Sequence, residues 1–128
     1  MKHEYCYATD DLDVDRIVAT FTPDGVLDVP IHEHIEGHDG LAAYFEWFAE
    51  REYQTRAHNV FNHVIDVDRD TATGEWYYMV LYTLPGRNAE TSHGHDDVEF
   101  VRTDDGWKLS STSARRRITR EVSADAIE

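Results

Sequence analysis

The strongest fold signal in the chain is the stretch Glu75-Trp76-Tyr77-Tyr78-Met79-Val80-Leu81-Tyr82-Thr83-Leu84. Aromatic and branched side chains dominate it, and such side chains favour a pleated, half-buried strand over a surface helix. Directly before it, Asp70-Thr71-Ala72-Thr73-Gly74 has the composition of a turn. From Val60 to Ile65 the pattern has a period of two residues. These segments predict a long β-hairpin whose second strand is buried.

A second hairpin is predicted downstream. Pro85–Thr91 is expected to form a loop, and Val98–Arg102 has the alternation of a strand. Thr103-Asp104-Asp105-Gly106 provides turn chemistry, and Trp107–Ala114 is expected to be the returning strand. Arg115-Arg116-Arg117 would then leave the last strand as a solvated exit.

The first half of the chain has helical periodicity. Between Tyr5 and Phe21 the apolar residues recur at helical spacing, which predicts one amphipathic helix that Pro23-Asp24-Gly25 ends as a turn. Val26–Ile31 is short and rich in branched residues, which predicts a strand.

Ile35–Asp39 is expected to be a polar loop, and Asp39 can cap a second helix over Leu41–Glu50. Helices followed by antiparallel strands define an α+β fold.

Composition limits the possible architectures and partners. At 128 residues, with no internal repeat or linker, the chain is expected to form a single domain over residues 1–128. Acidic residues outnumber basic ones 26 to 12, and the net charge of −14 disfavours nucleic acids and anionic membranes as partners.

Several features bear on the compartment. No apolar run is long enough to span a bilayer, and the first residues lack the order of a signal peptide. The single cysteine, Cys6, excludes an intrachain disulfide. We therefore expect a cytoplasmic protein. Because ten of the twelve basic residues are arginine, the surface resembles that of proteins from salt-loving archaea.

The order of these segments resembles the NTF2-like superfamily, and within it the SnoaL-like group that includes scytalone dehydratase-like and bile-acid dehydratase-like lyases. Six short pieces carry the resemblance, in the correct order: Asp10–Arg16, Phe21–Asp28, Glu36–Leu41, Arg56–Asn59, Asp70–Gly74 and Asp104–Leu109. The resemblance implies a cone-shaped barrel, in which a strongly bent, mostly antiparallel sheet and N-terminal helices enclose an apolar pocket for a small molecule.

The resemblance also implies site residues. Dehydratase-like members have an aspartate in the first helix that is hydrogen-bonded to a histidine of the later sheet, and a second histidine on the strand after the helices. Asp10 matches the aspartate, His58 matches the second histidine, and either His93 or His95 matches the histidine of the later sheet. Scytalone itself is not expected to be the substrate, because Thr9 and Val29 stand where the scytalone-type enzyme has tyrosines.

An aspartate–histidine pair suits proton transfer, because the carboxylate fixes the imidazole tautomer and raises its basicity. We therefore expect acid–base catalysis without a cofactor or metal, in which Asp10 supports His93 or His95 as the base and His58 assists. On a strand, His93 and His95 would face the same way, and His58 would share its face with Val60. The residues expected to bind a small, partly apolar substrate are Tyr7, Tyr44, Tyr78, Val29 and Val60.

Other interpretations of the sequence stay open. The same fold hosts ligand-binding or assembly modules that lack catalysis. A carboxylate base would be favoured if Asp97 or Glu99 pointed inward. The clusters His32-Glu33-His34 and His93-Gly94-His95 contain metal-ligand types, although their spacing matches no specific metal motif. Finally, a homodimer or homotrimer through the outer sheet face is expected.

Overall fold

The computed structural model describes residues 1–29, 34–50, 55–83 and 89–122. Within these ranges, three helices and six strands follow one another in the order α1 (Lys2–Asp10), α2 (Val14–Ala19), β1 (Phe21–Asp28), β2 (Ile35–Glu36), α3 (Gly37–Glu50), β3 (Thr55–Asp68), β4 (Thr71–Thr83), β5 (Ala89–Thr103) and β6 (Gly106–Val122). The α+β class predicted from the sequence is confirmed.

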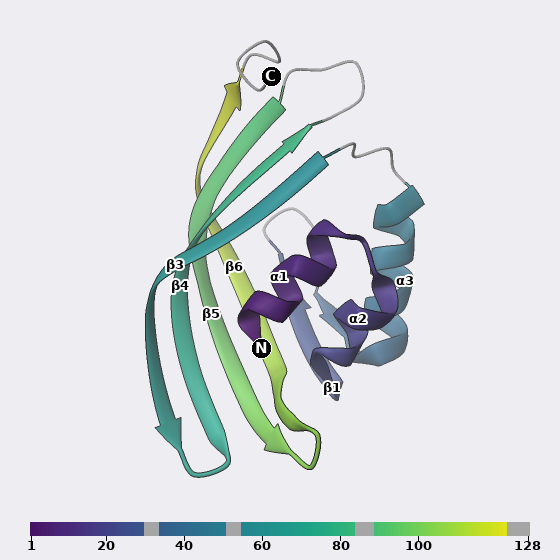
Figure 1. Ribbon diagram of the computed structural model, residues 1–128, viewed down its shortest axis with the longest axis vertical. Coiled ribbons are helices and arrows are strands. Elements are labelled where there is room, and N and C mark those ends of the chain that lie inside the picture. Colours follow the sequence, from purple (N-terminus) through teal and green to yellow (C-terminus); the bar gives the residue numbers. More distant parts are fainter. Residues whose placement is uncertain (30–33, 51–54, 84–88, 123–128) are drawn as a thin grey trace.

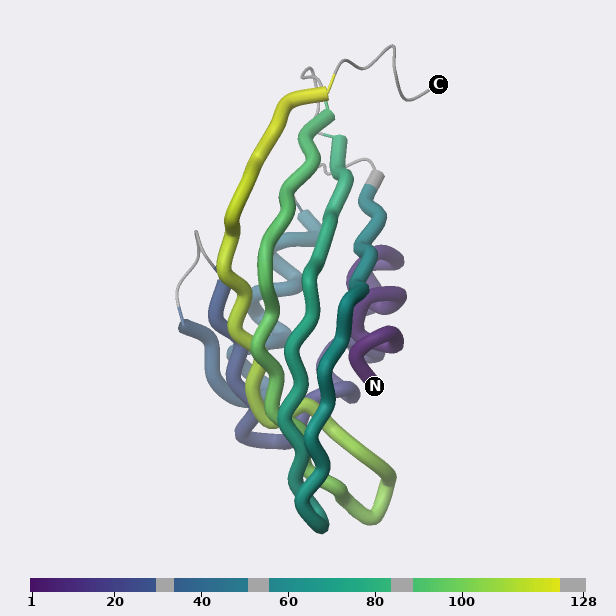
Figure 2. The backbone as a smooth tube through the Cα atoms, turned by 90° about the vertical axis from the view of Figure 1, so that its left-hand side faces the viewer, coloured from purple at the N-terminus to yellow at the C-terminus, as the bar shows by residue number. Residues whose placement is uncertain are grey.

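All six strands belong to one sheet with the order β2-β1-β6-β5-β4-β3. Every neighbouring pair is antiparallel except β1 and β6, which run parallel. The long strands β3 to β6 bend together, and the helices lie on the concave side of the sheet (Figure 1). Figure 2 shows the four long strands side by side, with the helices behind them. The expected bent, mostly antiparallel sheet covered by N-terminal helices is therefore present.

The prediction of one helix from Tyr5 to Phe21 is wrong, because the chain breaks between α1 and α2. Leu12 adopts a left-handed backbone conformation with φ of 54°, which a continuous right-handed helix cannot contain. Asp13 then caps α2, because its side chain accepts a hydrogen bond from the Arg16 backbone N–H at 3.2 Å. As a result, Asp10 is the last residue of α1.

The predicted turn at Pro23-Asp24-Gly25 is also wrong, because these residues lie inside β1. The pairing of β1 with β6 shifts register between Phe21 and Val26, so the turn-forming residues make a bulge instead. A Cβ atom at Gly25 would overlap the Phe21 side chain. The strand predicted over Val26–Ile31 coincides with the end of β1, and its last two residues lie outside the described ranges.

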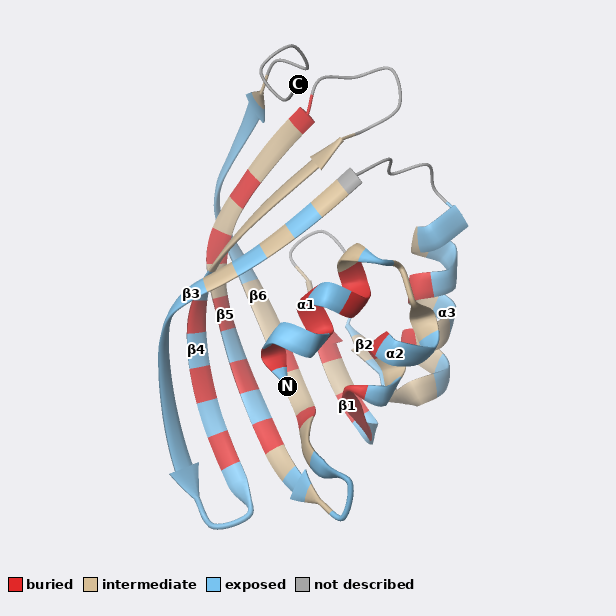
Figure 3. Cartoon of the chain, in the orientation of Figure 1, coloured by how far each residue is buried: buried red, intermediate tan, exposed pale blue. Residues whose placement is uncertain are grey.

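Strand β5 is longer than predicted, since it begins at Ala89 and continues to Thr103. Residues 89 to 91 of the predicted loop are therefore strand, whereas residues 84 to 88 lie outside the described ranges. Along β5 buried and less buried residues alternate, which Figure 3 shows as regular red bands. Ser92, Gly94 and Asp96 face the concave side, whereas His93 and His95 face the outer side.

Strand β6 continues beyond the predicted end at Ala114 to Val122, so Arg115–Arg117 belong to the strand. The helix predicted over Leu41–Glu50 corresponds to α3, which begins earlier, at Gly37. The core lies between this helix, α2 and the sheet, and its largest fully buried side chains are Ile17, Phe21, Leu41 and Leu109. Within the described ranges, none of the helices has the length and apolar character needed to cross a membrane.

Candidate functional site

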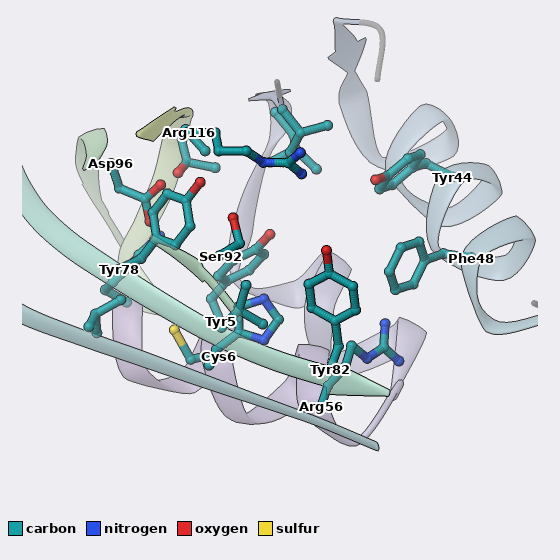
Figure 4. Close-up of a pocket in the computed structure, with 18 residues that line it drawn as sticks. Tyr5, Cys6, Tyr44, Phe48, Arg56, Tyr78, Tyr82, Ser92, Asp96 and Arg116 are labelled. Carbon is teal, nitrogen blue, oxygen red and sulfur yellow. The ribbon is translucent and has the colours of Figure 1, made fainter. Parts of the chain in front are cut away.

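A cavity of about 200 Å³ opens between the concave face of the sheet and helices α1 and α3 (Figure 4). Its walls are mostly apolar, with a small set of polar side chains. The lining residues are Lys2, Tyr5, Cys6, Leu27, Val29, Tyr44, Phe48, Arg56, His58, Val60, Tyr78, Val80, Tyr82, Ser92, Asp96, Thr112, Ala114 and Arg116. An apolar cavity with few polar groups is the usual form of a small-molecule site.

At one wall of this cavity, Asp10 and His58 form a close pair. Asp10 Oδ1 lies 2.5 Å from His58 Nδ1. The backbone N–H of His58 donates to both carboxylate oxygens of Asp10, at 3.1 and 2.9 Å. Because Asp10 ends α1 and His58 lies near the start of β3, the pair also ties the first helix to the sheet.

The hydrogen bond to Asp10 fixes the tautomer of the His58 imidazole. A carboxylate can only accept, so Nδ1 carries the proton of the hydrogen bond to Asp10. Nε2 is then the ring nitrogen that can accept a proton from a molecule in the cavity. The sequence prediction that Asp10 pairs with His93 or His95 is wrong, because both histidines point away from the concave face.

A second polar pair, Lys2 with Asp96, was not identified from the sequence. Lys2 Nζ lies 2.7 Å from Asp96 Oδ2, and the two side chains are only 4% and 9% exposed. The ammonium group also lies 5.0 Å from the centre of the Tyr5 ring, a favourable cation–π arrangement. Such a buried ion pair offers both hydrogen-bond donors and an acceptor inside the cavity.

One signal in the sequence could have pointed to Asp96. It has the same parity as the apolar residues Val98 and Phe100, whereas Asp97 and Glu99 have the opposite parity. In the structure Asp97 and Glu99 are exposed on the outer face, so they do not provide the inward carboxylate that a carboxylate-base enzyme would need.

Burial raises the pKa of three ionisable groups of the cavity. Desolvation, reinforced by Asp96, raises the pKa of the Tyr5 hydroxyl far above its ordinary value. Desolvation also raises the pKa of Tyr78, with partial opposition from Ser92 and Arg116. The Cys6 thiol has its pKa raised to about 11, mainly by desolvation. All three side chains therefore stay protonated near neutral pH.

Most of the residues expected to bind substrate lie at the cavity. Val29, Tyr44, Val60 and Tyr78 line it. Tyr7 does not, because it is 65% exposed on the outward side of α1. Tyr82, whose hydroxyl and ring the sequence also offers to an apolar ligand, lines the cavity as well. The sequence did not predict Arg56, Ser92 or Arg116 as substrate-binding residues, yet all three line the cavity.

Arg56 and Tyr82 lie near the α3 side of the cavity. The Arg56 guanidinium lies 4.5 Å from the centre of the Phe48 ring, and the Tyr82 hydroxyl donates to Glu90 at 2.5 Å. Figure 4 shows both residues on the side of Phe48 and Tyr44, with Asp96 and Arg116 toward the opposite end. Polar groups therefore lie at both ends of the cavity, and the hydroxyl groups of Ser92 and Tyr5 lie between them.

A bent sheet closed by helices around such a cavity is also the fold of an NTF2-like protein of Novosphingobium aromaticivorans, which is 20% identical, with a TM-score of 0.77 over 88% of this chain and 75% of that one. More narrowly, the chain belongs to the SnoaL-like family, because the model of the SnoaL-like domain matches residues 1–113. A search of curated proteins found no match.

Solved structures agree on the fold. A protein of Novosphingobium aromaticivorans assigned as an aromatic ring hydroxylase is 24% identical, with a TM-score of 0.87 over 94% of this chain and 87% of that one. A protein of the same organism assigned as a scytalone dehydratase is 19% identical, with a TM-score of 0.86 over 94% and 82% of the two chains. A hexachlorocyclohexane dehydrochlorinase from Novosphingobium barchaimii is 17% identical, with a TM-score of 0.84 over 94% and 84%.

Proposed function

We propose that this chain binds a small, partly apolar molecule that carries a carbonyl or hydroxyl group and acts on it as a lyase or isomerase. The observation that carries the proposal is the Asp10–His58 pair at the wall of the cavity. His58 takes the role of base that the sequence prediction gave to His93 or His95.

In the proposed reaction, His58 Nε2 removes a proton from the carbon next to the substrate carbonyl, and the C–H electron pair forms an enolate. In a dehydration, the enolate expels the β-hydroxyl group, which takes the proton back from the His58 imidazolium and leaves as water. In an isomerisation, the proton returns to a different carbon. Asp10 stabilises the imidazolium that forms between these steps and keeps its ring oriented.

The polar side chains at the Asp96 end of the cavity support the orientation of a bound substrate. Lys2, Tyr5 and Tyr78 can donate hydrogen bonds, and Asp96 can accept them. A ligand hydroxyl group can donate to Asp96 while it accepts from Lys2 or Tyr78. Two of the similar structures carry the names of a dehydratase and a dehydrochlorinase, which agrees with an elimination reaction.

The second candidate is a ligand-binding module without catalysis. Thr9, the residue beside Asp10, favours this candidate. Its hydroxyl is buried and donates to the Tyr5 backbone carbonyl at 2.7 Å. Thr9 therefore offers no group to polarise a bound molecule, and Val29 lines the cavity with an apolar side chain.

The homodimer or homotrimer and the cytoplasmic location stay predictions. The outer face of the sheet exposes the apolar side chains Phe61, Val64, Tyr77 and Ile118, which supports association through that face. Light scattering coupled to gel filtration would measure the oligomeric state.

One experiment separates the two candidate functions. Hydroxy-carbonyl and unsaturated carbonyl compounds are first screened for binding by thermal shift, and each binder is then incubated in D₂O and followed by NMR. We expect exchange of the proton next to the carbonyl, with a loss of about a hundredfold or more in Asp10→Asn and His58→Ala. His93→Ala is the matched control and is expected to keep full exchange.

Binding without exchange in the wild-type protein would favour the binding module. Exchange at the wild-type rate in both Asp10→Asn and His58→Ala would remove the proposed mechanism.

A further inference from the structure

We propose that Glu75, His95 and Asp97 form a binding site for a divalent transition-metal ion on the outer face of the sheet. The three side chains come from two neighbouring strands. Glu75 lies on β4 directly opposite Asp97 on β5, and His95 precedes Asp97 by two residues. The register therefore brings one imidazole and two carboxylates to one side of the sheet.

The distances between the three ligand atoms match those around a small metal ion. His95 Nε2 lies 3.3 Å from Asp97 Oδ1 and 3.5 Å from Glu75 Oε2, and all three ligand atoms lie within 4.8 Å of one another. Zinc–nitrogen and zinc–oxygen bonds of about 2.0–2.2 Å place neighbouring tetrahedral ligands roughly 3.3–3.6 Å apart. Because the Glu75 and Asp97 oxygens lie within 4.8 Å of each other, a metal ion would require these two atoms to approach by at most about 1.5 Å.

Hydrogen bonding does not account for this arrangement. His95 Nε2 is buried and lacks a hydrogen-bond partner among the described residues, despite the two nearby carboxylates. The side chain as a whole is only 21% exposed. A buried polar nitrogen without a hydrogen bond is costly, and a metal ion bound to Nε2 would remove that cost.

The electrostatics also favour a cation here. Like charges directly opposite on neighbouring strands destabilise a sheet, and Glu75 faces Asp97 in this way. Arg115 relieves only part of this repulsion, since its Nη2 donates to Asp97 Oδ2 at 2.9 Å. That contact leaves Asp97 Oδ1 directed at His95. It also holds the orientation of the carboxylate, as hydrogen bonds to metal ligands do in known metal sites.

Neighbouring side chains hold the imidazole in place. The Tyr77 ring packs edge-on against His95, with 5.9 Å between ring centres and an interplanar angle of 76°. One imidazole with two carboxylates suits Zn²⁺ and related first-row ions better than Ca²⁺ or Mg²⁺, which prefer oxygen ligands alone. Water would complete the coordination. The site lies on the face opposite the cavity, so it is independent of the proposed catalytic pair.

Isothermal titration of the metal-stripped protein with ZnCl₂ tests the proposal. We expect saturable binding in the wild type and a loss of affinity of more than about tenfold in His95→Ala, Glu75→Gln and Asp97→Asn. His93→Ala is the matched control, because His93 lies on the same strand and the same face but outside the cluster. It is expected to bind zinc as the wild type does.

Three results would overturn the proposal. The first is the absence of saturable zinc binding in the wild type, and the second is an unchanged zinc affinity in His95→Ala. The third is a loss of zinc affinity in His34→Ala but not in His95→Ala, because His34 also contacts two carboxylates, Asp28 and Glu36. Circular dichroism of each variant would confirm that the fold is retained, so that a loss of affinity reports on the ligands. Titration with Co²⁺ adds a spectroscopic readout, since ligation by His95 would change the visible absorption of the ion.

Discussion

Asp10 and His58 are 48 positions apart in the chain, yet one carboxylate accepts hydrogen bonds from both the backbone N–H and the ring Nδ1–H of the histidine. The backbone contact places the strand beside the helix end, and the ring contact sets the imidazole tautomer. The same aspartate therefore contributes to folding and to the chemistry proposed for the cavity.

Replacement of Asp10 by asparagine tests both contributions. Hydrogen bonds to charged groups contribute more than neutral ones, so we expect Asp10→Asn to lower the free energy of unfolding by about 1–3 kcal/mol. Long-range nitrogen–proton NMR should show a change in the His58 tautomer. Asp11→Asn is the matched control, because Asp11 is exposed and contacts Arg16 instead. Unchanged stability and tautomer in Asp10→Asn would contradict this role.

The burial of the Lys2–Asp96 pair predicts a larger loss of stability than the one expected for Asp10→Asn. Removal of one partner leaves a buried charge without compensation, so Lys2→Met should destabilise the protein by about 3–5 kcal/mol. The double variant Lys2→Met with Asp96→Leu should be more stable than the single variant, since neither charge remains. Urea denaturation measures both values. A double variant less stable than Lys2→Met would show that the pair does not behave as a buried ion pair.

Gly94 lies next to the cavity residue Tyr78 at a position of β5 that has no room for a side chain. A Cβ atom there would overlap the Tyr78 ring and the backbone carbonyl of Arg115. We expect Gly94→Ala to cost about 1–3 kcal/mol and to displace Tyr78. Gly40→Ala is the control, because a Cβ at that position in α3 meets only the Ile35 methyl group, at 3.5 Å. Thermal unfolding should separate the two variants, and equal melting temperatures would refute the packing argument.

The contacts of His34 predict how its contribution to stability depends on pH. Hydrogen bonds that the His34 ring donates to Glu36 and Asp28, at 2.7 and 2.6 Å, raise the pKa of His34 above its ordinary value of 6.5. The folded state thus favours the protonated imidazole. Its contribution to stability is fully present below the unfolded-state pKa of about 6.5 and is lost as the pH rises through the higher folded-state pKa.

An NMR titration of the His34 ring protons measures this shift. We expect Glu36→Gln to lower the pKa, and Asp39→Asn, which removes a carboxylate outside this pair of contacts, to leave it unchanged. A His34 titration that is insensitive to both Glu36→Gln and Asp28→Asn would refute the assignment.

Cys6 provides a probe of the cavity. Raising the thiol pKa from 9.0 to about 11 lowers the thiolate fraction near pH 8 about a hundredfold. Labelling by a disulfide reagent should therefore be slow in the folded protein and fast in urea. Cys6 is the only cysteine, so Cys6→Ser should abolish the signal. Equal labelling rates in the folded and unfolded protein would contradict the burial of this thiol.

Local patterns predicted much of the fold because they depend on near neighbours. The aromatic stretch that ends β4, the apolar face of α3 and the turn after Asp104 all appear where the sequence indicates them. The single helix over Tyr5–Phe21 failed because the left-handed conformation at Leu12 has no local sequence signal. The bulge in β1 was missed because turn-forming residues suit both a bulge and a turn.

The candidate site was predicted in part for the same reason. Parity correctly grouped His58 with Val60 and His93 with His95, since side chains alternate along any strand. Parity alone does not say which face is covered, so the assignment of His93 and His95 to the cavity failed. Neighbouring side chains of a strand point to opposite faces of the sheet, so Asp96 is buried whereas Asp97 is exposed. A shift of the strand register by one residue would exchange these two faces.

By itself, the sequence determined the α+β class, the order of most elements and the identity of Asp10 and His58 as candidate residues. The tertiary structure decided which histidine Asp10 holds, that Lys2 reaches Asp96, and that Glu75 meets His95. These contacts join residues far apart in the chain, and they depend on strand register and on the bend of the sheet. No local pattern encodes those two properties, because they are set by the packing of the whole sheet against its helices.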